Sequence, residues 1–591
     1  MENPLLELQE YENLQEALKK AKGPVQATGT LDSQKVHLMY WLGKDGGFPW
    51  KLVVTYDDQR AREIYDDFRS FTENVWLYPA KDLLFYSADI HGNLMTRQRI
   101  AVWRHLMEEK EGVVVTTLDG LMDHLLPLVF LKQQAVTVEN GQIMDLDEWK
   151  ERLTALGYER TAQVDGMGQF SIRGGIVDIF PLTEEVPVRI ELWDDEVDSI
   201  RSFDPESQRS VEQLEKITIY PSAETILTKK QLEAGIERLE KEEKEYEAAL
   251  RAKHQIEEAS RIRGIIKELT EGIRQGWKRD GLDAYIRYFC PETVSFLDYF
   301  PAGDTLICLD EPARLKEKGE TVEQEFRESM IHRLEKGYLL PGQTELLYAG
   351  TQVLAKLQSS YTVMLTGLDQ KLPGMKVKEK FSFDVRNVNS YQNSFDMLIS
   401  DLTRWKKEGY RVVLLSASRT RASRLASDLR EYDLRAYCPD GTGEEHKAAP
   451  GEILVTYGNI HRGFEYPLIK YVIITEGDMF GTEKKKKRRK KSNYQGKAIQ
   501  SFSELAVGDY VVHEEHGLGI YKGIEKVERD KVIKDYIKIE YGDGGNLYLP
   551  ATRLESIQKY AGADAKKPKL NKLGGTEWNK TKTRVKGAVQ E

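Results

Sequence analysis

The hydrophobic pattern of this 591-residue chain changes its period along the sequence, and this change limits the folds that the chain can adopt. Over residues 1–134, short β-branched runs such as Lys51–Thr55 and Gly112–Thr117 alternate with amphipathic helical segments. Such a βα rhythm predicts a parallel sheet covered by helices. The chain is also too long for one domain, so a multi-domain α/β protein is expected.

Residues 135–220 break this rhythm with short strands that are bounded by turns. Val188, Ile190 and Leu192 alternate with polar residues, which predicts an antiparallel α+β insert. The charged stretch that follows, 229–273, predicts a packed helical hairpin. Because the βα rhythm then returns, residues 1–134 and 221–372 are expected to complete one discontinuous α/β domain around the insert.

Three further segments complete the chain. Residues 373–482 read as a smaller α/β domain, and residues 483–500 as a linker. Residues 501–562 are nearly all β with closely spaced turns, which predicts a small barrel. Residues 563–591 read as a linker and the start of a helix, so the chain is expected to continue into a further element.

The net charge argues against DNA contact over the whole surface. Lys and Arg number 86 against 96 Asp and Glu, which gives −10. The exception is a run of eight cations, which is either a solvated linker or a sequence-independent polyanion contact: Lys484, Lys485, Lys486, Lys487, Arg488, Arg489, Lys490 and Lys491.

Cysteine usage and hydropathy exclude other classes. The three cysteines lie far apart, so neither a zinc ribbon nor a disulfide framework is expected. No apolar run approaches the roughly 20 residues that cross a membrane. A cytoplasmic protein without membrane association is predicted.

The first α/β domain has the place for a nucleotide site but lacks its motif. A P-loop needs Gly-Lys-Ser/Thr to hold the phosphates and Mg²⁺. Here Gly29 is present, but Lys35 is followed by Val36. Asp310 and Glu311 end a strand in the manner of the acidic Mg²⁺ ligands. The segment is either a structural relic or a residual nucleotide site, and no catalytic residue is predicted.

The sequence between His513 and His516 is not expected to bind a metal. It has a His at each end of a four-residue β/turn segment, and residues i and i+3 of a strand point to opposite faces. No metal ligand is therefore predicted.

Two surfaces are candidates for protein binding. In the insert, Arg189 and Trp193 alternate with the apolar set and should face outward, and Arg173 follows a strand and precedes two glycines. An exposed Trp beside Arg is typical of a binding hot spot, and the alternative is an ordinary solvated sheet face. In the β unit, Ile537 is either core or the apolar anchor of an edge strand that accepts a partner's strand.

Long motifs in two units resemble one family. FSIRGGIVDIFP with VRIELWDDEVDSIRSFDPESQRS is similar to the second domain shared by UvrB and the transcription-repair coupling factors. ELAVGDYVVHEEHGLGIYKGIEKV with DYIKIEYGDGGNLYLPATRLESIQKY resembles the RNA-polymerase-interacting domain of those factors, which is related to CarD-type regulators. Two further segments, HKAAPGEILVTYGNIHRGFEYPLIKYVIITEGDMFG and KLGGTEWNKTKTRVK, fit the same family in collinear order.

The resemblance implies a fold for each unit and two partners. The first domain would be a degenerate RecA-type, UvrB-like α/β domain, and residues 501–562 a Tudor- or CarD-like barrel. Residues 135–220 would bind UvrA through Arg173, Arg189 and Trp193, the last being commonly Phe in the family. The barrel would bind the β subunit of RNA polymerase by strand addition at Ile537, Lys538 and Ile539.

The resemblance also implies what this chain lacks. The family couples ATP hydrolysis with Mg²⁺ to translocation on double-stranded DNA, through a pair of motor domains that these residues do not contain. The chain alone is thus expected to be a monomeric adaptor without a cofactor, not an enzyme. Two alternatives stay open, a UvrB-like helicase acting alone and a CarD-like transcription regulator with an unrelated extension.

Overall fold

A computed structural model gives the architecture of most of the chain. It describes residues 3–481, except 21, 82–92, 165, 206, 276–280, 371–373, 393 and 440–447. Beyond 481 it describes residues 505, 507–513, 516–529, 532–542, 545–550, 557–559 and 570. The basic run 484–491 and nearly all of residues 563–591 lie outside the described residues.

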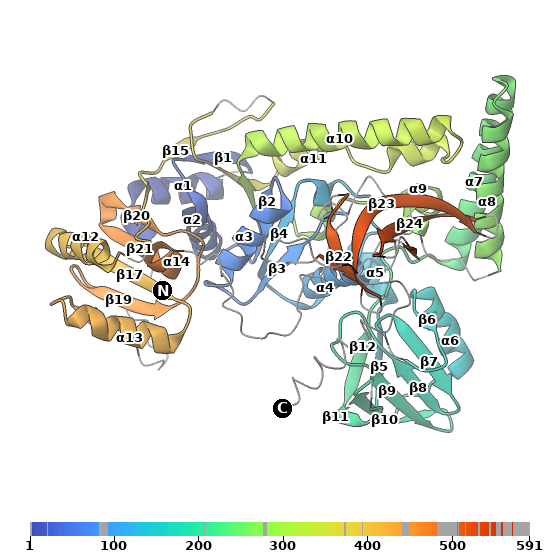
Figure 1. Ribbon diagram of the computed structural model, residues 1–591, viewed down its shortest axis with the longest axis horizontal. Coiled ribbons are helices and arrows are strands. Elements are labelled where there is room, and N and C mark those ends of the chain that lie inside the picture. The colour runs from blue at the N-terminus through green and yellow to red at the C-terminus, as the bar shows by residue number, and fades with distance from the viewer. Residues whose placement is uncertain are drawn as a thin grey trace.

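A seven-stranded, all-parallel sheet forms the largest unit (Figure 1). Its strand order is β15-β1-β14-β13-β2-β4-β3. The strands are β1 (Gly23–Thr28), β2 (Trp50–Thr55), β3 (Val75–Tyr78), β4 (Gly112–Thr117), β13 (Thr305–Asp310), β14 (Tyr361–Thr366) and β15 (Lys380–Ser382). Strands from both sides of the insert therefore share one sheet, because β13 pairs with β2 and β14 pairs with β1.

Helices cover this sheet, as the βα rhythm predicts. They are α1 (Gln9–Lys20), α2 (Asp32–Asp45), α3 (Asp58–Phe68), α4 (Asn93–Glu108), α10 (Pro312–Glu335) and α11 (Gly350–Leu357). Asp57 caps α3 by accepting a hydrogen bond from the backbone of Arg60, which satisfies one of the unpaired N–H groups of the first turn. Among the described residues, no helix is long and apolar enough to cross a bilayer.

The insert contains a six-stranded sheet of order β11-β10-β9-β8-β7-β6. The strands are β6 (Glu159–Arg160), β7 (Gln169–Arg173), β8 (Ile176–Ile179), β9 (Val188–Trp193), β10 (Glu196–Phe203) and β11 (Ser210–Leu214). The pairings from β7 to β11 are antiparallel, and β6 joins β7 in parallel. The insert also contains α6 (Leu146–Ala155) and the pair β5 (Val136–Glu139) and β12 (Lys216–Ile219), and α5 (Leu128–Gln134) directly precedes it.

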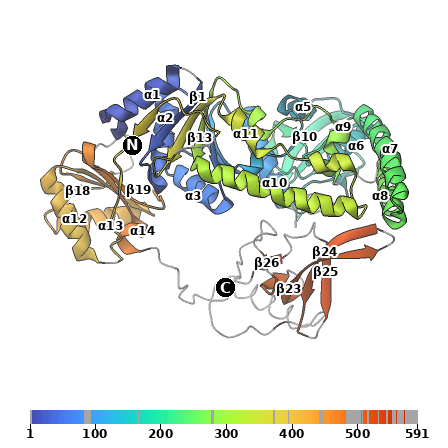
Figure 2. The same cartoon turned by 90° about the horizontal axis from the view of Figure 1, so that it is seen from above.

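A helical hairpin follows, as the sequence predicts. It consists of α7 (Lys229–Ala252) and α8 (Ile256–Arg274), whose buried side chains include Leu239, Ile262 and Ile266. The short α9 (Ile286–Phe289) packs beside α7. Figure 2 shows α10 running from the large sheet toward this hairpin, where the Tyr246 hydroxyl donates to the Leu334 carbonyl at 2.8 Å.

The third unit is a mixed sheet of order β16-β20-β21-β17-β19-β18. Its strands are β16 (Arg386–Asn387), β17 (Arg411–Ser416), β18 (Ala436–Tyr437), β19 (Ile453–Tyr457), β20 (Phe464–Tyr466) and β21 (Tyr471–Thr475), and its helices are α12 (Phe395–Glu408), α13 (Arg419–Arg430) and α14 (Glu476–Phe480). One hydrophobic core continues from this unit into the first, since Phe464 and Ile473 belong to the same cluster as Val36.

The last unit is an antiparallel sheet of order β25-β24-β23-β22-β26. Its strands are β22 (Tyr510–His513), β23 (Gly517–Arg529), β24 (Val532–Glu540), β25 (Asn546–Pro550) and β26 (Ile557–Lys559). In the described pairings β25 and β26 are its edges, so these pairings form an open sheet.

Candidate functional site

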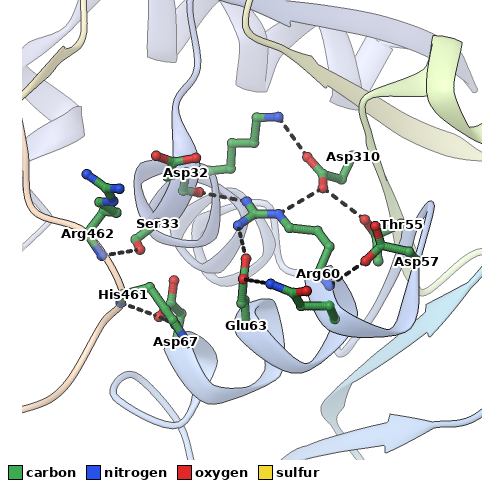
Figure 3. A network of polar contacts seen from close by, with 12 residues as sticks. Asp32, Ser33, Thr55, Asp57, Arg60, Glu63, Asp67, Asp310, His461 and Arg462 are labelled. Atoms are coloured by element: carbon green, nitrogen blue, oxygen red, sulfur yellow. Dashed lines mark hydrogen bonds and ion pairs between the residues drawn. The ribbon is translucent and has the colours of Figure 1, made fainter. Parts of the chain in front are cut away.

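The position of a nucleotide site in the first unit is filled by the chain's own side chains (Figure 3). The ammonium group of Lys35, in the first turn of α2, donates to Asp310 at 2.7 Å and to Glu311 at 2.6 Å. Lys35 and Asp310 are both buried. The loop before α2 is also occupied, because a Cβ atom at Gly29 would collide with the carbonyl oxygen of Phe383.

A second cation completes the neutralisation of Asp310. The guanidinium of Arg60 donates to its carboxylate at 3.2 Å, and the Thr55 hydroxyl donates at 2.9 Å. Burial alone would raise the pKa of Asp310, but the charges of Lys35 and Arg60 outweigh it and hold the pKa below its usual range. Asp310 does not fit the role of a Mg²⁺ ligand, because protein donors already occupy both of its oxygens, and Glu311 is held by the same Lys35 and by the backbone N–H of Gly367.

A loop of the third unit that includes His461 and Arg462 lies beside this cluster. The His461 ring nitrogen contacts the buried carboxylate of Asp67 at 2.7 Å, and the backbone N–H of Arg462 donates to the Ser33 hydroxyl at 3.0 Å (Figure 3). The hydrogen bond to Asp67 raises the pKa of His461 above its ordinary value, although burial acts in the opposite direction. Deeper in the junction, Gln34 donates to the Tyr466 hydroxyl at 3.0 Å.

The outward face of the six-stranded sheet carries the residues that the sequence singles out. Val188 and Ile190 are buried, whereas Trp193 is 81% exposed, so the predicted division of β9 into two faces is confirmed. We call the side that bears Arg189 and Trp193 the outer face. An indole so exposed contributes little to a core and is available to a partner.

The two arginines of the outer face are held by a carboxylate that sequence reasoning missed. Arg189 donates to both oxygens of Asp178, at 2.7 and 2.9 Å, and Arg173 donates to one of them at 2.6 Å. Asp178 is buried, so it orients both guanidinium groups. The sequence did carry a signal for Asp178. It is the single acid within the apolar run Ile176–Ile179, and alternation places it on the outer face.

The prediction of an exposed edge strand at Ile537 is wrong. β24 is a central strand, since Ile537 pairs with Ile524 of β23 on one side and with Leu549 of β25 on the other. Ile537 and Ile539 are both fully buried. Alternation could not reveal this, because a central strand and an edge strand of a half-buried sheet share the same period.

The third residue of that predicted set, Lys538, lies on the opposite face. Its ammonium donates to Glu525 at 2.7 Å and lies 5.7 Å from the centroid of the Tyr548 ring, its cross-strand neighbour on β25. Tyr548 remains 39% exposed on an edge strand. Among the described residues of this edge strand, β25, the accessible apolar side chain is therefore that of Tyr548, and Ile537 is not accessible.

The two histidines considered for metal binding lie together at a turn. The rings of His513 and His516 stack with centroids 4.8 Å apart, and His513 is buried. Within the described part of the chain, no group of three His, Cys, Asp or Glu residues is placed to hold a metal ion.

The fold and these surfaces define a multi-domain α/β protein with two modules suited to protein binding. Residues 136–224 match the UvrB interaction domain family, and residues 505–561 match the CarD-like/TRCF RID domain family. The chain is therefore built from a UvrB-like interaction module and a CarD-like module joined to α/β units.

Whole-chain comparison identifies the relatives. The chain is 34% identical over 545 residues to the transcription-repair-coupling factor of Bacillus subtilis. The aligned region covers 91% of this chain and 45% of the relative. The same factor of Staphylococcus haemolyticus is 32% identical over 547 residues, and that of Staphylococcus aureus (strain MRSA252) 31% over 550, with the same coverage. The chain is thus a homologue of transcription-repair-coupling factors, and it spans about half the length of the curated relatives it matches.

Proposed function

We propose that this chain acts in transcription-coupled nucleotide-excision repair as an adaptor between stalled RNA polymerase and UvrA. The observation that carries the proposal is the presence of both matched modules in one chain that is related to transcription-repair-coupling factors over 91% of its length. Each module offers a separate surface, so the contribution of this chain is binding energy and geometry.

The UvrA contact is assigned to the outer face of the insert, through Arg173, Arg189 and Trp193. Three features support this assignment: the exposure of Trp193, the half-exposed guanidinium of Arg173, and the fixing of both arginines by Asp178. The two arginines, which Asp178 already holds in place, lose little conformational freedom on binding.

The polymerase contact is assigned to the β unit, and strand addition there would use an edge. β25 has a free side in the described pairings and carries the exposed Tyr548, so it is the strand to which we assign the contact with the β subunit. We also assign a barrel to residues 501–562, which would require β25 and β26 to meet.

The energy-dependent steps are assigned to other parts of the full-length relatives. The translocation of the family on double-stranded DNA would need ATP and Mg²⁺ in motor domains of the RecA type. The cluster around Lys35 and Asp310 supports the absence of this chemistry from the first unit. DNA contact by this chain would fall to the run Lys484–Lys491, which lies outside the described residues.

The proposed organisation keeps the boundaries that the sequence predicts. Residues 1–134 and 221–372 form the UvrB-like domain around the insert 135–220, followed by a third α/β domain at 373–482. The exception is the boundary at residue 373, because β15 (Lys380–Ser382) lies beyond it yet pairs with β1 in the sheet of the first domain. We expect a monomer that works in the cytoplasm.

A bridging experiment tests the proposal. The chain is immobilised and exposed to core RNA polymerase and then to UvrA, and both should bind at once. Trp193→Ala should weaken the UvrA step alone, and Tyr548→Ala should weaken the polymerase step alone. Binding of polymerase without UvrA would favour the CarD-like regulator, and binding of neither would refute the adaptor.

A further inference from the structure

A second exposed apolar side chain lies in one row with Trp193, although it is about 50 residues away in the sequence. Glu196 of β10 pairs with Trp193 of β9 on one side and forms an antiparallel bridge with Ile143 on the other. Directly opposed residues of neighbouring antiparallel strands point to the same face of the sheet. Ile143, Glu196 and Trp193 therefore form one row across the end of the outer face.

The Ile143 segment is fixed to the sheet. The backbone N–H of Met144 donates to the Asp195 carbonyl at 2.7 Å, and that of Val197 donates to the Gln142 carbonyl at 2.8 Å. The Met144 side chain is buried in the main core. Ile143 itself is 62% exposed, so the fold holds the backbone in place and presents this side chain to solvent.

The row continues the surface that carries the two arginines. Trp193 lies four residues beyond Arg189 on the same strand and face, a separation of about 13 Å at the rise of an extended chain. The outer face thus has a charged end, at Arg173, Asp178 and Arg189. At its other end the exposed Ile143 and Trp193 flank the exposed Glu196, and we call this the apolar end. Paired exposed apolar side chains beside fixed guanidinium groups are typical of protein interfaces.

We propose that Ile143 is a binding residue that, with Trp193, forms the apolar end of the UvrA-binding surface. The proposal rests on the UvrA contact proposed above. The complementary surface of UvrA would place an apolar side chain over the row and acidic groups about 13 Å away, near Arg189.

The test compares UvrA binding by the full chain and by three single variants. Ile143→Ser and Trp193→Ala should each weaken binding at least tenfold, because each truncates one of the two exposed apolar side chains of the row. The matched control is Val211→Ser, which changes a 66% exposed apolar residue of β11 outside the row. The control should bind within twofold of wild type. All three variants should keep the wild-type thermal midpoint, because the changed side chains are exposed.

The double variant adds a second criterion. Residues that share one partner group are coupled, so Ile143→Ser should cost less in the Trp193→Ala background than in wild type. Wild-type affinity for Ile143→Ser, with weakened binding for Trp193→Ala, would overturn this inference and leave the UvrA contact standing. Equal losses from Val211→Ser and Ile143→Ser would also overturn it. A wild-type chain that does not bind UvrA would refute the proposed function itself.

Discussion

Replacing Lys35 by Met should loosen the first unit without changing its fold. Lys35 is buried between two carboxylates, one of which, Asp310, is fully buried. Removing one partner of a buried ion pair typically costs about 3–5 kcal/mol. Arg60 still contacts Asp310 in the variant, so we expect the lower end, about 3 kcal/mol.

Hydrogen exchange measures this loss locally, which suits a chain with several units. At 1.36 kcal/mol per decade, about 3 kcal/mol corresponds to roughly a hundredfold faster exchange. The affected peptides should cover β13 and α2. The control is Lys318→Met, which removes the same charge from a more exposed lysine 3.7 Å from Asp119, and it should change exchange less than about tenfold.

The pH dependence supplies an independent check on the same variant. Because the pKa of Asp310 is depressed in the folded chain, its stabilising contribution is present above the unfolded value of about 3.9 and is lost as pH falls through the folded pKa. Wild type and Lys35→Met should therefore converge in acid. Exchange in β13 and α2 that differs by less than about tenfold near neutral pH would refute the reasoning.

Three other outcomes follow from the structure. The pKa of His461 is raised in the folded chain, so its contact with Asp67 stabilises the fold fully below about pH 6.5 and loses this effect as pH rises through the folded pKa. Hydrogen exchange around residues 459–462, corrected for its intrinsic pH dependence, should therefore become faster toward pH 8. His461→Gln should abolish that dependence, and an unchanged profile in the variant would contradict the assignment. Ile537→Ala should cost the β unit about 2–4 kcal/mol in urea unfolding, because the side chain is fully buried, whereas Tyr548→Ala should cost under about 1 kcal/mol. Millimolar Mg²⁺–ATP should leave the thermal midpoint of the chain unchanged, since Lys35 bridges both acids and Arg60 also holds Asp310. A stabilising shift would instead support the residual nucleotide site.

The cluster of Lys35 and Asp310 in the first unit lies beside the contact between the first and third units. α2 carries Lys35 toward the buried carboxylates and Ser33 toward the loop at Arg462. The same helix also packs Val36 into the core that the two units share. The first and third units are thereby joined by continuous packing.

The sequence by itself determined the features that depend on local period. Apolar runs such as Thr305–Asp310 predicted buried parallel strands, and alternation along Val188–Trp193 predicted which side chains face outward. The missing Gly-Lys-Ser/Thr at Lys35 argued against a working P-loop. Each of these inferences rests on neighbours within a few residues, which is the range over which helix and strand periods act.

Only the tertiary structure decided which distant residues meet. Lys35 contacts Asp310, which is 275 positions away in the sequence, and Asp67 contacts His461, which is 394 positions away. The central place of Ile537 and the row of Ile143 with Trp193 depend in the same way on strand order and register. Local alternation shows that a strand has two faces, but the neighbours on either side of it are set by long-range pairing, which has no local period to read.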